Sequence, residues 1–188
     1  MHEGRHEHGG MTSSDVIDTR SAILSSGIGE GQSVLDLGCS IGDYAIEASK
    51  FVGNGIVYGM DAHENSIRLL GERIRDLGIE NIKVMHVDVT RGIPLADGSI
   101  DRILVFNVLH GFAYNGEYYS VLKEMERVLA REGIVSIIES RPGAVGKGPS
   151  EEVRLTNDRI SELMALIDLK MIERSEISPY HDIFLFSR

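Results

Sequence analysis

The strongest constraint in this sequence is the alternation of short apolar runs with amphipathic segments of helical period. The apolar runs predict strands at residues 33–37, 55–60, 81–87, 100–106 and 134–139. Helical patterns fall between them, at residues 42–52, 64–77 and 118–130. Strands that alternate with crossover helices run parallel in one sheet.

The C-terminal part of the chain breaks this alternation. A helix capped by Thr156 precedes two strand-like runs, at residues 170–177 and 182–186, with only a turn at Ser178-Pro179 between them. Two strands without a helix between them form an antiparallel hairpin. The sequence therefore predicts an α/β fold: a doubly wound, mostly parallel seven-stranded sheet with an antiparallel C-terminal hairpin.

The first residues differ in composition from the rest. Residues 1–13 include His2, His6 and His8 and lack an apolar period, which predicts a flexible histidine-rich tail or a lid over a ligand. The histidine spacing suits a metal, but floppy histidine tails bind metals mostly incidentally, so no metal site is assigned. From Ser14, which caps a helix, to residue 188 we predict a single domain.

Charge and cysteine content narrow the class of partner. The chain carries 19 Lys and Arg against 29 Asp and Glu, a net charge of −10 that disfavours a nucleic-acid partner. A single cysteine, Cys39, cannot form an internal disulfide, so we expect a cytoplasmic protein. The longest stretch without charged residues, 103–116, is too short to span a membrane, and no signal peptide is recognisable.

Candidate ligand-binding residues follow three successive strands. Asp36 and the turn 38–42 come at the end of the first strand, Asp61 at the end of the second, and Asp88 at the end of the third. Ligands of doubly wound sheets bind at these carboxyl ends. Asp61 lies 23 residues after Gly38, near the ~20 expected of an acid that binds ribose hydroxyls. A glycine turn alone is often only a tight loop, and a strand-end Asp is often a cap, but their coincidence indicates a nucleoside site.

A nicotinamide dinucleotide is the competing ligand. The full Gly-x-Gly-x-x-Gly pattern is absent, because Ser40 stands where the second glycine belongs. A carboxylate at Asp36 also repels a doubly negative pyrophosphate. A ligand with a positive arm, such as an α-amine or a sulfonium, suits this turn better.

At this point the sequence resembles a known family. Residues 34–42 (VLDLGCSIG) resemble the first motif of class I S-adenosylmethionine-dependent methyltransferases, and residues 57–61 (VYGMD) their second strand with its acidic end. Residues 94–101 with 107–110, and 122–129 with Gly133, are similar to the subgroup of ubiquinone/menaquinone-biosynthesis methyltransferases. The resemblance implies a Rossmann-like fold and S-adenosylmethionine as cofactor.

The resemblance also implies roles for particular residues. The turn wraps the methionine part of the cofactor near Asp36, Asp61 holds the ribose hydroxyls, Asp88 contacts the adenine amine, and Asn107 lies under the methionine end. The complete implied cofactor set is Asp36, Gly38, Cys39, Ser40, Gly42, Asp61, Ala62, Asp88, Val89 and Asn107. Ser40 departs from the glycine usual in the family, and its Cβ crowds the approach of a ligand.

The candidate residues for catalysis and for binding the substrate come from segments whose sequence patterns are less informative. His110 and Tyr114 follow the fourth strand and are the candidate catalytic residues, with a structural role for His110 equally open. Arg141, just past the fifth strand, is a candidate for binding the substrate, although a solvated arginine is an alternative. Tyr180 and His181 open the last strand and are further substrate candidates.

These features predict an enzyme that transfers a methyl group from S-adenosylmethionine to a small, uncharged or cationic molecule. The sulfonium already activates the methyl group, so the protein must align the acceptor and exclude water. Two alternatives stay open: a non-catalytic module that binds the cofactor, and a methyltransferase that acts on protein or RNA. The acceptor atom and the oligomeric state are not predicted.

Overall fold

The fold is built on one seven-stranded sheet. The computed structural model describes residues 17–144 and 148–188. The strand order in the sheet is β3-β2-β1-β4-β5-β7-β6. The strands are β1 (Ser33–Leu37), β2 (Ile56–Asp61), β3 (Ile82–His86), β4 (Ile100–Phe106), β5 (Leu129–Ser140), β6 (Lys170–Ser178) and β7 (His181–Ser187). The first five are parallel and β7 is antiparallel to both its neighbours, which confirms the predicted fold class.

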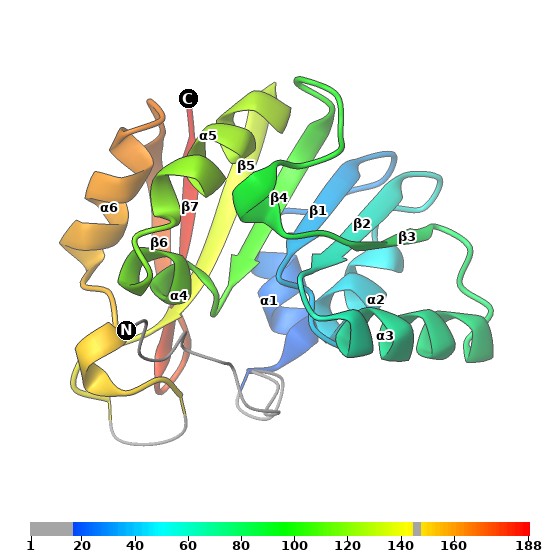
Figure 1. The fold of residues 1–188 in the computed structure, drawn as a ribbon, viewed down its shortest axis with the longest axis horizontal. Coiled ribbons are helices and arrows are strands. Elements are labelled where there is room, and N and C mark those ends of the chain that lie inside the picture. Colours follow the sequence, from blue (N-terminus) through cyan, green and yellow to red (C-terminus); the bar gives the residue numbers. More distant parts are fainter. Residues whose placement is uncertain (1–16, 145–147) are drawn as a thin grey trace.

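Helices cover both faces of the sheet (Figure 1). The helical segments are α1 (Thr19–Ser25), α2 (Asp43–Ser49), α3 (Glu64–Asp76), η2 (Val89–Arg91), α4 (Leu109–Tyr114), α5 (Tyr118–Val128), η3 (Glu151–Val153) and α6 (Asn157–Ala165). In Figure 1, α4, α5 and α6 lie together over the half of the sheet formed by β4 to β7. The lengths of the crossovers fit parallel strands, which need about a dozen residues or more to return to the same end.

The hydrophobic core is divided by the sheet into two parts. Successive strand residues point to opposite faces, so the neighbours Val34 and Leu35 of β1 enter different clusters. Leu35 packs with residues of α5 and α6, whereas Val34 packs with residues of α1 and α2. Because both faces are covered, the central strands send apolar residues to both sides of the sheet, as the runs in the sequence predict.

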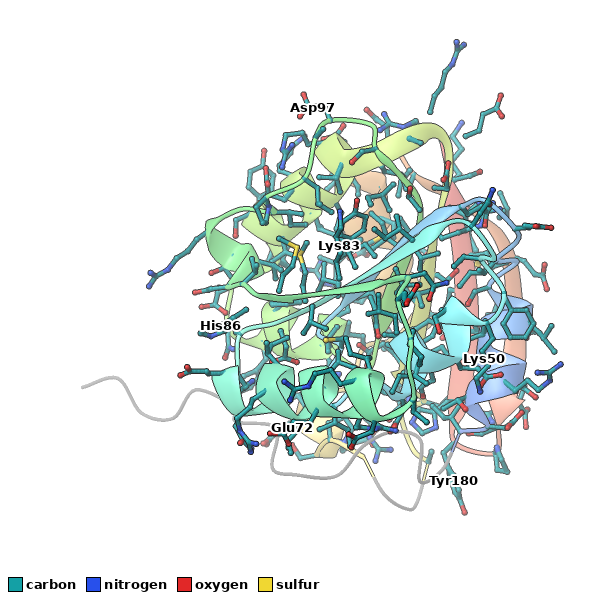
Figure 2. The ribbon with its side chains drawn as sticks, turned by 90° about the vertical axis from the view of Figure 1, so that its right-hand side faces the viewer. Lys50, Glu72, Lys83, His86, Asp97 and Tyr180 are labelled. Atoms are coloured by element: carbon teal, nitrogen blue, oxygen red, sulfur yellow. The ribbon has the colours of Figure 1, made fainter. Side chains whose placement is uncertain are left out.

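Strand register brings the carboxyl ends of the parallel strands to one edge. Leu37 of β1 pairs with Met60 of β2, and Ser140, the last residue of β5, pairs with His181, the first of β7. The β6–β7 turn therefore lies at the same edge as the ends of β1, β2, β4 and β5. Figure 2 shows the consequence: Tyr180 in this turn lies at the opposite end of the molecule from Asp97, which precedes β4.

Two elements differ from the prediction. Residues 109–114 form helix α4, which the sequence did not reveal because six residues are too few to establish a helical period. Strand β5 begins at Leu129, whereas its apolar run begins at residue 134. The pairing with β4 jumps from Ile100–Leu129 to Arg102–Ile134, so the intervening residues bulge out of the ladder and interrupt the apolar pattern.

The N-terminal predictions lie outside the described residues. These are the tail or lid at residues 1–13, with His2, His6 and His8, and the cap at Ser14. The described part of the first helix starts at Thr19, where Asp18 Oδ2 accepts a hydrogen bond of 2.8 Å from the backbone N–H of Ser21. Within residues 17–144 and 148–188, no helix has the length and apolar character needed to cross a bilayer.

Candidate functional site

The turn between β1 and α2 has a left-handed backbone at three positions. The φ angles are +77° at Gly38, +49° at Ser40 and +85° at Gly42. A Cβ at Gly42 would lie 2.2 Å from Cδ1 of Leu70, and one at Gly38 would lie 2.6 Å from Cγ1 of Val108. Both glycines are thus required by conformation and by space. Ser40 adopts a left-handed conformation that glycine takes more readily, and the predicted crowding of a ligand by its Cβ stays a prediction.

Asp61 fastens this turn to the end of β2. Its Oδ2 atom accepts a hydrogen bond of 2.9 Å from the backbone N–H of Ser40, and its Oδ1 atom accepts one of 2.8 Å from the backbone N–H of His63. Only 10% of the Asp61 side chain is exposed. The two backbone N–H groups therefore fix the orientation of the carboxylate beside the turn.

Asp36 is the most perturbed carboxyl group of the site. It is 2% exposed, and its Oδ2 atom has no hydrogen-bond partner in the part of the chain that the structure describes. Burial, and then the negative charge of Asp61, raise the pKa of Asp36 to about 7. A buried carboxyl oxygen without a donor is costly, so this position suits a ligand that brings a donor or a positive charge.

Asn107 presents a second incompletely satisfied group at the end of β4. Its φ angle is +55°, and neither its Oδ1 nor its Nδ2 atom has a hydrogen-bond partner among the described residues, although both are buried. Strand β4 neighbours β1 at the point where the strand order reverses. Ligands of this class of sheet bind at that reversal. Asn107 and Asp36 thus supply unsatisfied polar atoms at the expected place.

The end of β3 has a different arrangement. Asp88 caps η2: its Oδ1 atom accepts from the backbone N–H of Thr90 at 3.1 Å, and its Oδ2 atom lies 3.2 Å from Nε of Arg91. Val89 is 6% exposed and packs in the core, whereas Ala62 is exposed. Asp88 lines an open hollow of about 550 Å³, and neither Asp36 nor Asp61 is among the described residues that line it. Asp88 therefore has the capping role that strand-end aspartates often have.

His110 forms a buried pair with Glu139. The Nδ1 atom of His110 lies 2.7 Å from Oε2 of Glu139, and the backbone N–H of His110 donates to Oε1 at 3.0 Å. The two side chains are 1% and 2% exposed. A carboxylate oxygen accepts, so Nδ1 is the donor of this pair and carries a hydrogen. Glu139 thereby joins α4 to the end of β5.

Of the other acceptor-side candidates, Tyr114 and Tyr180 are accessible. Tyr114 is 56% exposed at the end of α4, and Tyr180 is half-buried in the β6–β7 turn. The Arg141 guanidinium is engaged within the hairpin: Nη1 donates to Glu176 Oε2 at 3.1 Å, and Nη2 donates to the carbonyl of Ser178 at 2.8 Å. The alternative of a freely solvated Arg141 therefore does not describe its position.

His181 is inside the hairpin. It is 2% exposed, and its Nε2 and Nδ1 atoms each lie 3.0 Å from a serine hydroxyl, those of Ser140 and Ser178 respectively. Burial is the main cause that lowers the pKa of His181, because it disfavours the charged ring. The structure places this candidate among packing residues, with its polar atoms facing neighbouring strands.

The lowered pKa predicts how His181 affects stability. The folded protein resists protonation of the ring, whereas the unfolded chain protonates near pH 6.5, so this contribution is complete above pH 6.5 and is lost as the pH falls. We expect the free energy of unfolding to fall by at most ~1.4 kcal/mol per pH unit below that value on account of this group. Urea unfolding of the wild type and of His181→Gln at several pH values measures it. Parallel pH profiles for the two proteins would contradict the prediction.

Two residues of the site were not predicted. Glu139 ends a predicted strand, so the rule that selected Asp36 and Asp61 also applies to it. The Nδ1 atom of His63 lies 2.9 Å from Oδ1 of Asp61, and no sequence pattern predicts that contact. Within the described residues, no group of three or more His, Cys, Asp or Glu side chains is arranged to hold a metal ion.

Fold and site together define a doubly wound α/β domain with a carboxylate-flanked glycine turn at its switch point. The chain belongs to the family of methyltransferase domains: the family model described as "Methyltransferase domain" matches residues 28–175. The match confirms the predicted resemblance to this family, and the observed sheet confirms the predicted Rossmann-like fold.

Individual proteins extend the comparison. The chain is 32% identical over 121 residues to demethylmenaquinone methyltransferase of Geobacillus stearothermophilus, covering 62% of this chain and 49% of the relative. It is 35% identical over 124 residues to the enzyme of the same name from Staphylococcus aureus (strain MRSA252), covering 64% and 48%. The chain thus spans about half the length of the curated relatives it matches.

A solved structure agrees over almost the whole chain. A SAM-dependent methyltransferase from Aquifex aeolicus superposes with a TM-score of 0.83 at 25% identity, covering 92% of this chain and 90% of that one. The superposition covers a larger share of the chain than the family model, whose match ends at residue 175, within β6.

Proposed function

We propose that this protein transfers a methyl group from S-adenosylmethionine to a small-molecule acceptor. One observation carries the proposal. A glycine turn at the switch point of a methyltransferase-family fold lies beside the buried Asp36 and the half-buried Asn107, whose buried polar atoms include some without a hydrogen-bond partner among the described residues. A ligand with an amine and a sulfonium supplies the donors and the positive charge that these atoms lack.

The described residues fit this cofactor. Asp36 and Asn107 would face its methionine end, and the turn of Gly38, Cys39, Ser40 and Gly42 would lie along its methionine part. Asp61 and Ala62 would hold the ribose, because Asp61 has a fixed orientation and only partly used acceptor capacity. Asp88 and Val89 would border the adenine, and for Asp88 this requires that one oxygen accept an additional hydrogen bond beside Thr90 and Arg91.

Bound S-adenosylmethionine supplies a methyl group already activated by its sulfonium. The protein's part is to orient the acceptor in line with that group and to exclude water, and proximity and orientation alone lower such a barrier by ~7–11 kcal/mol. Where the acceptor must lose a proton, we assign acceptance to Nε2 of His110, since Glu139 holds the hydrogen on Nδ1. Tyr114 and Tyr180 line the accessible side of this edge, and we propose that they contact the acceptor.

Arg141 and His181 would act on the acceptor through the hairpin. Both are bonded to residues 176–178 or to Ser140, so they fix the turn that carries Tyr180. The backbone N–H of Arg141 also donates to the carbonyl of Tyr180 at 2.8 Å. We therefore propose positioning roles for these two residues.

Turnover tests the proposal. The protein is incubated with S-adenosylmethionine and a fractionated cell extract, and S-adenosylhomocysteine is measured. We expect product only with the fraction that contains small molecules. Because the similar curated proteins are named demethylmenaquinone methyltransferases, demethylmenaquinone is the first pure acceptor to try. Asp61→Ala serves as the inactive control.

Each other outcome identifies an alternative. Product that forms only with protein or RNA fractions, and disappears after protease or nuclease treatment, would identify a macromolecular methyltransferase. Tight binding of S-adenosylhomocysteine without turnover in any fraction would identify a binding module. The net charge of −10 favours a small molecule over nucleic acid. The single cysteine is consistent with the cytoplasm as the place of action.

A further inference from the structure

The imidazole of His63 lies on the carboxylate that we propose binds ribose. His63 is the residue before α3, and its side chain makes no hydrogen bond that caps the helix. Instead, its Nδ1 atom lies 2.9 Å from Oδ1 of Asp61. The backbone N–H of His63 donates to the same oxygen at 2.8 Å. Asp61 Oδ1 therefore already faces two nitrogen atoms of one residue.

The Asp61 carboxylate has fewer unoccupied acceptor sites than the binding of both ribose hydroxyls requires. A carboxylate offers about four lone-pair positions. Ser40 and His63 occupy two of them through their backbone N–H groups, and the His63 ring occupies a third. One position remains, whereas a ribose that binds through both vicinal hydroxyls needs two. The two backbone donors are fixed by the turn and by the start of α3, so only the ring can leave.

The ring is free to move. The His63 side chain is 62% exposed, in contrast to 10% for Asp61, so rotation about its χ angles takes it into solvent without disturbing the core. Nothing in its backbone prevents this, since its φ and ψ angles of −95° and 110° belong to the extended region.

We propose that His63 is a displaceable competitor at the nucleoside site: its imidazole occupies an acceptor position of Asp61 and swings out when the ribose hydroxyls bind. This inference rests on the proposed function, since it concerns the same site. Its consequence is a reduced affinity for adenosine-containing ligands, because binding must first break the His63–Asp61 contact. The presence of His63 thus sets how tightly cofactor and product are held.

Calorimetry with S-adenosylhomocysteine at one fixed pH tests the direction of the effect. Exposed ion pairs and hydrogen bonds contribute up to ~1 kcal/mol, so we expect His63→Ala to bind up to about fivefold more tightly than the wild type. His86→Ala is the matched control. This exposed histidine ends the neighbouring strand β3 (Figure 2) and pairs with Asp61 only through the backbone register of the sheet. Its ring contacts the carbonyl of Ala62 at 2.9 Å rather than the Asp61 carboxylate. We expect its affinity to stay within twofold of the wild type.

A double-mutant cycle separates competition from other causes. In an Asp61→Asn background, adding His63→Ala should change the affinity by less than twofold, because the contact has already been weakened. A decrease in affinity for His63→Ala alone would overturn the proposal and show that the ring supports Asp61. An equal gain in both backgrounds would also overturn it. If the wild type binds no S-adenosylhomocysteine at all, the proposed function itself fails. Equal affinities of the wild type and His63→Ala would instead overturn only the proposal about His63.

Movement of the ring gives a second measurement that is independent of affinity. In protein with ¹⁵N-labelled histidine, the Nδ1 signal of His63, assigned by its loss in His63→Ala, reports its hydrogen bond to Asp61. Saturation with S-adenosylhomocysteine should shift this signal toward that of a histidine in a short unfolded peptide. A signal that stays in place while the ligand is bound would show that ring and ribose share the carboxylate, contrary to the proposal.

Discussion

Replacing Asp61 with alanine is expected to weaken the binding of S-adenosylhomocysteine by at least about a hundredfold. The variant loses the acceptor that we propose for both ribose hydroxyls, and hydrogen bonds to a charged group contribute ~1.5–3 kcal/mol each. Every ~1.4 kcal/mol corresponds to a tenfold change in Kd. The backbone N–H of Ser40 also loses its partner, so the turn itself becomes less well fixed. Isothermal calorimetry on the purified protein measures the change.

The control separates lost binding from lost structure. Asp61→Asn retains an acceptor oxygen and the size of the side chain, so it should keep the fold and bind with intermediate affinity. Circular dichroism and the melting temperature of both variants without ligand establish that they are folded. A folded Asp61→Ala protein that binds within threefold of the wild type would contradict the role of Asp61.

The second large effect concerns Asp36 and pH. The pKa of this buried carboxyl is raised from its ordinary value of 3.8 to about 7, by burial and by Asp61, so the folded protein keeps its proton where the unfolded chain has lost it. The contribution of this group to the free energy of unfolding is therefore lowest above pH 7 and increases as the pH falls toward 3.8. Between about pH 5 and pH 7 this amounts to two pH units at ~1.4 kcal/mol each, or about 3 kcal/mol.

Asp36→Asn removes this dependence. We expect the stability of the variant relative to the wild type to rise by about 3 kcal/mol as the pH is raised from about 5 to about 8, as measured by urea unfolding. The new buried amide adds an offset that does not vary with pH, so only the slope is diagnostic. A difference in stability that stays constant over this range would show that Asp36 is already ionised in the fold.

Much of the fold was predictable because it depends on patterns spread over many residues. Five apolar runs separated by helical patterns leave few arrangements other than a parallel sheet, and the missing helix before the last strand implies the hairpin. Local features without a pattern were not predictable. Helix α4 has only six residues, and the bulge at the start of β5 depends on its pairing with Ile100 of β4.

The site was predictable as far as strand ends determine it. Asp36 and Asp61 lie where the end of each parallel strand places them, beside a turn whose glycines have positive φ angles. The contacts of each side chain were not predictable, because they depend on residues distant in the sequence or on the local backbone after a strand. Glu139 meets His110 across 29 positions, and the capping of η2 by Asp88 depends on the backbone after β3.

A crystal structure with S-adenosylhomocysteine bound tests the central claim most directly. The account predicts both ribose hydroxyls within hydrogen-bond distance of Asp61, the methionine part along residues 38–42, and its amine on the side of Asp36 and Asn107. Density for the ligand at another place on the chain, or binding of NAD where S-adenosylhomocysteine does not bind, would contradict it.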